Sequence, residues 1–461
     1  MWRSAVRTQY NPSSGVFHTR RIRYEMHWVC TGIISAIVAF NVSLAAAESR
    51  PLVDVKRELY AKHPKKGTAI NVSVCYVGPD LEREEIHSWE AVSDEPERPM
   101  RRRSRDNGRT WSELEPIADI VSKVGEYMVY WGCGPMFYDA DAGVTASIWL
   151  RQTYKGPVYM NQCFYRLSRD NAMTWFEAKQ LRYEDGPVFN PSDPANAEFL
   201  KRNRAYLGNN IIRHSNGTLI HCVAAANVPY ENKQGASYHP WVPADAKDIG
   251  SLCFVGKWNR ETNDYGWTAG KPVWVPLEVS SRGLMEPDVV ELKDGRVLVV
   301  WRGSDTPVTE GRKWFSVSDD GGRTLSAVQE LKYDDGSRFY SPSSIHRFIR
   351  HSITKKLYWV GNICAAPPRG NMPRYPLIIA EVDEAIPALK RNTVTVIDDR
   401  APEEGPDVQL SNFSLFEDRE THHLELYLIK FAADPKDVWQ SADAFKYVLT
   451  LRPDPQSPSA P

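Results

Sequence analysis

The chain has 461 residues, with 57 Lys and Arg against 58 Asp and Glu, and its formal net charge is −1. Hydrophobic residues make up 42% and charged residues 25%, which excludes a disordered chain, a collagen-like chain and a multi-span membrane protein. The balanced charge also argues against a nucleic-acid partner, because such proteins usually carry a basic excess. The 15 Trp, 21 Tyr and 32 Pro favour strands and short turns over long helices.

Residues 1–47 have the pattern of a secretory signal peptide. Three arginines within residues 20–23 precede an apolar run over residues 28–40, and a small-residue stretch ends at Ala47. The apolar run is shorter than the ~20 residues of a membrane span. The alternative to a cleaved signal peptide is an uncleaved membrane anchor. We therefore expect a secreted or periplasmic protein whose only membrane contact is this segment. At the other end, residues 453–461 form a Pro- and Ser-rich tail that we expect to be disordered.

Cysteines follow the leader at six positions, and none of them has Cys-x-x-Cys or another zinc-ligand spacing. We therefore expect no metal site, and the sequence indicates no other cofactor. Export permits disulfides, but six cysteines allow about fifteen connectivities, and the spacing does not choose among them.

Three segments share the pattern Ser-x-Asp-x-Gly-x-Thr-Trp. They read SRDNGRTW at 104–111, SRDNAMTW at 168–175 and SDDGGRTL at 318–325. An Asp carboxylate can accept backbone N–H bonds across a tight turn, Gly allows a positive φ, and Trp can pack beneath a hairpin. The repeat therefore predicts three hairpin turns of similar build.

A second repeat consists of apolar hairpins. Residues 287–302 read PDVVELKDGRVLVVWR, which is two strands joined at the turn Asp294-Gly295. Similar hairpins begin near Asn71, Pro135, Asn210, Ser344 and Asn412. The 414 residues that follow the leader give 69 for each of six units, the size of a four-stranded blade. We expect an all-β fold, a six-bladed β-propeller over 48–452, with a seventh blade only if residues 231–267 contain another unit.

With these repeats the chain resembles the sialidase-like (BNR-repeat, Asp-box) β-propeller superfamily over most of its length. The resemblance implies a carbohydrate-active glycoside hydrolase whose site lies where the inner strands begin. In the family motif a Glu precedes a Val-Val-Glu-Leu strand, and an Asp-Gly-Arg turn leads to a strand that closes on Arg. Residues 285–302 read MEPDVVELKDGRVLVVWR, so the resemblance places Glu286 on the family's glutamate and Arg302 on one arginine of its triad.

Another triad arginine corresponds to Arg374 in GNMPRYPLIIAEVDE, with Arg369 as a rival. A guanidinium fork binds the carboxylate of a sialic or uronic acid through two parallel hydrogen bonds. Two family elements are missing, since Asn71 stands where the first arginine belongs and Leu410-Ser411-Asn412 stands where the nucleophilic tyrosine belongs. Sialidases use that tyrosine in place of a carboxylate nucleophile. The resemblance therefore indicates a glycosidase without indicating sialidase activity itself.

Polar residues of blades one and five are candidates for the missing groups. His87 lies close to Glu90 and Asp94, where the family has its general acid, and Tyr340 opens blade five. A tyrosine acts as an acid or base when a nearby cation lowers its pKa. His239 is a further candidate on a loop.

Three functions are compatible with the sequence. The first is hydrolysis of an acidic glycan, with Glu286 and Asp94 as acid and base and the two arginines holding a carboxylate. The second is a lyase reaction on a uronate polymer, in which His87 and Tyr340 abstract a proton beside the carboxylate. The third is a non-catalytic glycan-binding propeller. All three predict an acidic oligo- or polysaccharide as partner, and we expect a monomer.

Overall fold

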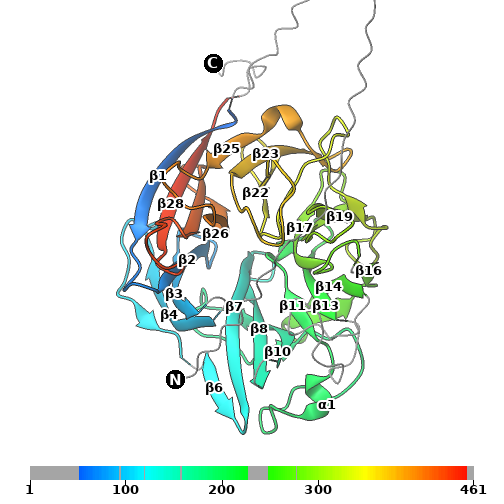
Figure 1. Ribbon diagram of the computed structural model, residues 1–461. Helices are drawn as coiled ribbons and strands as arrows, with labels where there is room; N and C mark the ends of the chain where they lie inside the picture. Colours follow the sequence, from blue (N-terminus) through cyan, green and yellow to red (C-terminus); the bar gives the residue numbers. More distant parts are fainter. Residues whose placement is uncertain are drawn as a thin grey trace, which may run out of the picture. The chain divides into compact units, whose positions relative to one another are not determined.

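The computed structural model describes residues 51–453 except for 93–94, 119, 156–157, 227–247 and 277. The chain divides into two units, 1–48 and 49–461, and only the second contains described residues. That unit consists of six antiparallel sheets arranged as the blades of a propeller (Figure 1). The predicted six-bladed all-β fold is therefore confirmed, and the described part of the chain contains no seventh sheet.

The first three blades follow one another along the chain. Blade 1 contains β2 (Ala69–Tyr76), β3 (Arg83–Val92), β4 (Glu95–Ser104) and β5 (Glu115–Pro116). Blade 2 contains β6 (Val121–Val124), β7 (Tyr127–Asp139), β8 (Val144–Lys155), β9 (Val158–Ser168) and β10 (Lys179–Gln180). A short helix, α1 (Ala197–Leu200), precedes blade 3. Blade 3 contains β11 (Ala205–Leu207), β12 (Ile212–Arg213), β13 (Thr218–Ala226), β14 (Asp248–Asn259), β15 (Asp264–Ala269) and β16 (Val273–Pro276).

The last three blades complete the ring. Blade 4 contains β17 (Met285–Glu291), β18 (Val297–Arg302), β19 (Lys313–Ser318) and β20 (Gln329–Glu330). Blade 5 contains β21 (Arg347–Arg350), β22 (Leu357–Asn362), β23 (Leu377–Asp383), β24 (Ala388–Leu389), the 3₁₀ turn η1 (Arg391–Thr393) and β25 (Thr395–Asp398). Blade 6 contains β26 (Gln409–Glu417), β27 (Leu424–Phe431), β28 (Asp443–Leu451) and β1 (Val53–Ala61).

The three Ser-x-Asp repeats form turns after the third main strand of blades 1, 2 and 4. In each turn the Asp carboxylate accepts hydrogen bonds from the backbone N–H of the Thr, at 2.8–2.9 Å, and from its hydroxyl, at 2.6 Å. The Ser hydroxyl accepts the N–H of the Gly or Ala four residues on, at 2.7–2.8 Å. Where Ala172 replaces the glycine, it adopts a φ of 62°. The repeat thus specifies a self-contained turn, because its polar side chains satisfy its backbone donors.

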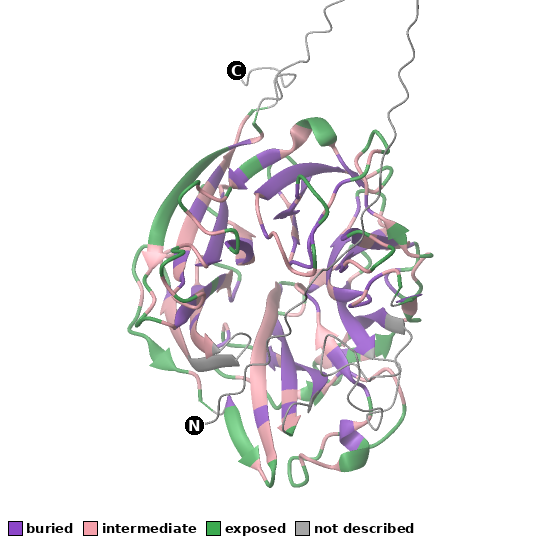
Figure 2. Cartoon of the chain, in the orientation of Figure 1, coloured by how far each residue is buried: buried purple, intermediate pink, exposed green. Residues whose placement is uncertain are grey.

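Apolar side chains fill the spaces between blades. One cluster joins blades 4 and 5 through Val300, Phe348 and Trp359, and another joins blades 3 and 4 through Ile220 and Trp301. Buried residues accordingly concentrate on the inner and middle strands (Figure 2). Among the described residues, no helix is long and apolar enough to cross a membrane.

One disulfide joins two neighbouring strands of blade 3. The register of β13 and β14 places Cys222 directly opposite Cys253, and the two sulfur atoms are bonded. Within the described part of the chain, the remaining thiols are free, at Cys75, Cys133, Cys163 and Cys364. The strand register therefore settles a pairing that the cysteine spacing left open.

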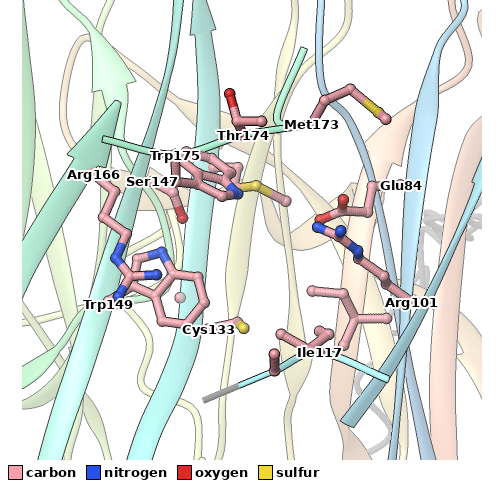
Figure 3. Close-up of a pocket in the computed structure, with 14 residues that line it drawn as sticks. Glu84, Arg101, Ile117, Cys133, Ser147, Trp149, Arg166, Met173, Thr174 and Trp175 are labelled. Atoms are coloured by element: carbon pink, nitrogen blue, oxygen red, sulfur yellow. The ribbon is translucent and has the colours of Figure 1, made fainter. Parts of the chain in front are cut away.

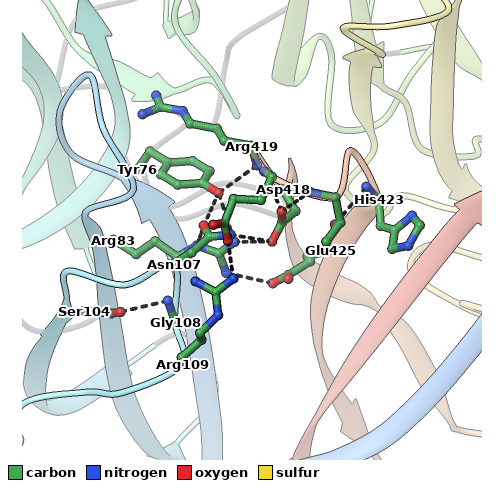
Figure 4. Close-up of polar contacts among 12 residues, drawn as sticks. Tyr76, Arg83, Ser104, Asn107, Gly108, Arg109, Asp418, Arg419, His423 and Glu425 are labelled. Carbon is green, nitrogen blue, oxygen red and sulfur yellow. Dashed lines mark hydrogen bonds and ion pairs between the residues drawn. The ribbon is translucent and has the colours of Figure 1, made fainter.

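The ring closes where the N-terminal strand β1 joins blade 6 as its outermost strand, paired with β28. Blade 6 then contacts blade 1 through a buried network around Arg83 (Figure 4). The Arg83 guanidinium donates to Asp418 at 2.7 Å and to Glu425 at 3.1 Å. The Nε of Arg83 also donates to the side-chain oxygen of Asn107 at 3.0 Å. Closure therefore depends on charged hydrogen bonds as well as on strand pairing.

Candidate functional site

The inner strand of blade 4 begins with an irregular backbone at Glu286. Pairing between β17 and β18 shifts register between Met285 and Asp288, and Glu286 has a φ of 40°. A positive φ costs a residue with a side chain about 1–3 kcal/mol and is found where the surrounding structure enforces it. Here Asn209 of blade 3 enforces it, because its side-chain amide donates to the Glu286 carbonyl at 3.0 Å and its backbone N–H donates to the Pro287 carbonyl at 2.8 Å.

Arg302 holds the Glu286 side chain from the end of the neighbouring strand. A terminal nitrogen of Arg302 donates to the Glu286 carboxylate, and its Nε donates to the Ser343 hydroxyl at 3.0 Å. Both side chains are largely buried, with 8% of Arg302 and 13% of Glu286 exposed. The spacing of the motif thus produces the contact, because the last residue of β18 lies opposite the first residue of β17.

Arg374 reaches the same place from blade 5. Its guanidinium donates to the Ser343 carbonyl at 2.9 Å and to the Gln409 side chain of blade 6 at 2.7 Å. Ser343 consequently links the two arginines, since its hydroxyl accepts a hydrogen bond from Arg302 and its carbonyl accepts one from Arg374. The rival candidate Arg369 is exposed and lies earlier in the same β22–β23 loop.

A fully buried lysine binds the backbone on both sides of Ser343. Lys313, the first residue of β19, donates from Nζ to the carbonyls of Pro342 and Ser344, at 3.1 and 2.6 Å. Burial holds the pKa of Lys313 well below its usual value, and the positive charges of Arg302 and Arg374 lower it further. The amine therefore fixes the backbone before and after Ser343, the residue that connects the two guanidinium groups.

Chemically, this cluster combines a carboxyl group with two guanidinium groups in a site of low solvent exposure. A carboxyl group can donate or accept a proton at a reacting oxygen, and arginines can hold an anionic substrate group. Within the described residues, no group of three or more His, Cys, Asp and Glu side chains could hold a metal ion.

The structure places His87 in a different cluster, inside blade 1. Its Nε2 shares a hydrogen bond with the carboxylate of Glu85, which also accepts from Tyr60 and, at 2.8 Å, from Arg102. Burial alone would raise the pKa of Glu85, but hydrogen bonds from His87, Tyr60 and Arg102 lower it. His87 thus belongs to a buried ion-pair group that joins β3 and β4 to β1.

Tyr340 contacts Arg312 and Cys364. Its ring packs against the Arg312 guanidinium, whose central carbon is 4.4 Å from the ring centroid, and its carbonyl accepts from the Cys364 N–H at 2.8 Å. Arg312 directly precedes Lys313 in the chain. The described contacts therefore bring Glu286, Arg302 and Arg374 together, whereas Tyr340 is joined to Arg312 and His87 belongs to a separate cluster.

Two of the remaining positions singled out in the sequence lie within the described part of the chain. Leu410, at the place of the family's tyrosine, is fully buried in the apolar core between blades 5 and 6. Asn71 lies on β2 opposite Ser88. Asp94 and His239 lie outside the described residues.

No motif of the sequence marks Lys313, Ser343, Gln409 or Asn209. For Lys313 one signal was available in the sequence. It is the first residue of a strand whose other residues are mostly apolar or small, and a lysine at such a position is either buried with the strand or marks the end of the strand. The other three act through contacts between blades, which no local pattern reports.

No family model matches the chain, and no curated protein matches it. Solved structures do match. A protein of unknown function from Dyadobacter fermentans is 13% identical with a TM-score of 0.54, covering 86% of this chain and 99% of that one. The NanB sialidase from Streptococcus pneumoniae is 11% identical with a TM-score of 0.53, covering 86% and 70%. An α-L-arabinanase from Penicillium chrysogenum is 13% identical with a TM-score of 0.50, covering 87% and 99%.

At these identities the likeness concerns the fold. The chain has the six-bladed β-propeller fold of sialidase-like proteins, as the repeats predicted.

Proposed function

We propose that the protein is a glycoside hydrolase of the propeller class that acts on glycans containing an acidic sugar. One observation carries the proposal: Ser343 links Arg302 to Arg374 directly beside the carboxyl group of Glu286. Two guanidinium groups at one point suit a substrate carboxylate, and a buried carboxyl group beside them suits proton transfer to the glycosidic oxygen. A sialidase and an arabinanase of the same fold make hydrolysis the first reaction to test.

In this reaction Glu286 acts as one of the two carboxyl groups that glycosidases use. Asp94 is our proposal for the second, since the family places its general acid in that part of blade 1. The buried Leu410 supplies no nucleophilic hydroxyl, so we propose that a carboxylate activates water or attacks the sugar.

A panel of substrates tests this proposal. Sialosides, rhamnosyl-glucuronides and uronate polymers are incubated with the purified protein, and new reducing ends are measured together with near-ultraviolet absorbance. Hydrolysis produces reducing ends without absorbance, whereas a lyase also produces an absorbing unsaturated product. We expect hydrolysis of at least one acidic substrate and none of its neutral counterpart.

Variants assign the reaction to the site. Glu286→Gln and Asp94→Asn should each lower kcat by about 100-fold or more, because each removes a proton-transfer group. Glu261→Gln, on an exposed hairpin, is the matched control and should leave kcat unchanged. Full activity of Glu286→Gln would contradict the assignment.

A second candidate is a non-catalytic glycan-binding propeller, and the apolar Leu410 at the family's tyrosine position favours it. It predicts no turnover on the whole panel, together with glycan binding that Glu286→Gln retains and Arg302→Ala abolishes.

A further inference from the structure

A cleft of about 220 Å³ lies between blades 1 and 2 (Figure 3). Strands β3 and β4 provide one wall, β7, β8 and β9 provide the other, and Trp175 of the second Ser-x-Asp turn borders it. None of the residues that line this cleft belongs to the Glu286 cluster.

One guanidinium group in the cleft has no acceptor within the described part of the chain. Arg166 extends from β9 over Trp149, with its central carbon 4.4 Å from that ring and 5.5 Å from the ring of Trp131. Its Nε is buried without a hydrogen-bond partner among the described residues. Stacking on two indole rings stabilises the cation and fixes its plane, but leaves its N–H groups without acceptors.

The opposite wall does not neutralise Arg166. There Arg101 pairs with Glu115 at 2.7 Å, and Glu84 pairs at 2.6 Å with Arg103, which does not itself line the cleft. Both glutamates are thus engaged by arginines of their own blade. The charged residues that line the cleft are two arginines, Arg101 and Arg166, and one carboxylate, Glu84, which leaves one positive charge unbalanced. Arg166 is the arginine of these two that pairs with no carboxylate of the described residues.

We propose that this cleft binds a small monocarboxylate the size of one sugar ring, held by Arg166 through its guanidinium fork. A carboxylate matches the fork in charge and in planarity, so it would supply the acceptors that Arg166 lacks. The volume lies below the ~300–1,000 Å³ of pockets for drug-sized ligands, which limits the occupant to a single ring. Trp175 offers an aromatic surface for the C–H face of such a ring (Figure 3). A hexuronic acid has both features, and the proposal does not depend on catalysis by Glu286.

Calorimetric titration of the full chain with D-glucuronate, D-glucose and sulfate tests the proposal. Titrations are made in the Arg302→Met/Arg374→Met background, so that binding at the Glu286 cluster does not contribute. We expect glucuronate to bind at least about tenfold more tightly than glucose or sulfate, because only glucuronate combines a planar carboxylate with a ring.

Arg166→Met keeps the stacked stem and removes the fork, so it should weaken glucuronate binding at least about tenfold. Arg166→Lys keeps the charge and should give an intermediate loss. The matched control is Arg169→Met, because Arg169 also lies over an aromatic ring, that of Phe176, but outside the cleft. Chemical unfolding confirms that each variant is folded.

Three results would overturn the proposal. They are an unchanged glucuronate affinity in Arg166→Met, an equal affinity for glucose or sulfate, and the absence of binding even at glucuronate concentrations well above about 1 mM. The first two would place the ligand elsewhere or deny its carboxylate specificity, and the third would make the cleft a packing space only.

Discussion

The side-chain nitrogen of Lys313 donates a 2.6 Å hydrogen bond to the carbonyl oxygen of Ser344. A second bond reaches Pro342, so the lysine brackets Ser343, to which Arg302 and Arg374 both bind. The geometry of two arginines from different blades therefore depends on one buried amine.

Replacement of this amine should change stability in a pH-dependent way. The lowered pKa means that the unfolded chain binds a proton that folded Lys313 does not, from that pKa up to about 10.4. Wild-type stability should therefore rise with pH across this window, and Lys313→Met should lose that part of the rise. The variant should also be about 2 kcal/mol less stable at pH near 9, because two buried carbonyls lose their donor. Urea unfolding at several pH values measures both effects, and parallel pH profiles would contradict the first.

The two arginines predict a difference between charge and geometry. Arg302→Lys keeps the positive charge, but an ammonium group cannot serve Glu286 and Ser343 as a planar fork does. On the acidic glycan that turns over, kcat/KM should fall by about 10- to 100-fold. Arg323→Lys, in the exposed third turn, should keep wild-type kcat/KM. Equal kinetics for the two variants would exclude a positioning role for Arg302.

Ring closure can be tested at Arg83, of which 1% is exposed. Arg83→Met leaves the buried carboxylate of Asp418 without its arginine and leaves Glu425 with Lys446, which should cost about 3–5 kcal/mol of unfolding free energy. The double variant Arg83→Met/Asp418→Asn should recover part of this loss, because one of those charges is gone. Chemical denaturation measures both, and a loss below about 1 kcal/mol would show that strand pairing alone closes the ring.

Blade 3 contains a histidine that should limit stability in acid. His221 is fully buried on β13, its Nδ1 lies 2.8 Å from the Asn210 carbonyl, and burial lowers its pKa to about 4. The unfolded chain binds a proton at this residue with a pKa of about 6.5, so stability falls as pH drops from about 6.5 toward about 4.

At about pH 5 this term amounts to roughly 2 kcal/mol relative to about pH 8. The variant His221→Gln should therefore lose about 2 kcal/mol less than the wild type between these pH values. Unfolding at both pH values checks this, with His423→Gln as the control that should behave like the wild type.

Much of the fold follows from local patterns. The three Ser-x-Asp turns and the hairpin at Asp294-Gly295 are specified by residues a few positions apart, so the sequence was enough to place them and to count six blades. The outer position of β1 was not predictable, because its residues Val53–Ala61 are mostly exposed and belong to no repeat. Its place is set by pairing with a strand at the other end of the chain.

The candidate site divides in the same way. Glu286 and Arg302 belong to one hairpin, so the motif that names them also brings them into contact. Lys313 lies opposite Arg302 on the next strand of blade 4. Ser343 joins them through the packing of blade 5 on blade 4, which sequence spacing does not determine. In the sequence His87 lies near Glu90 and Asp94, whereas the alternation of β3 directs His87 and Glu85 to the same side of the strand, where they share a hydrogen bond.

The pairing of Val53 with Leu451 joins positions that are about 400 residues apart in the chain. Because β28 is synthesised long after β1, this pairing can form only when nearly all of the blades have been made. Such a contact also slows folding, since a long loop must close before the pairing is gained. A chain that is interrupted before β28 therefore lacks the partner of β1, and its blades cannot close into a ring.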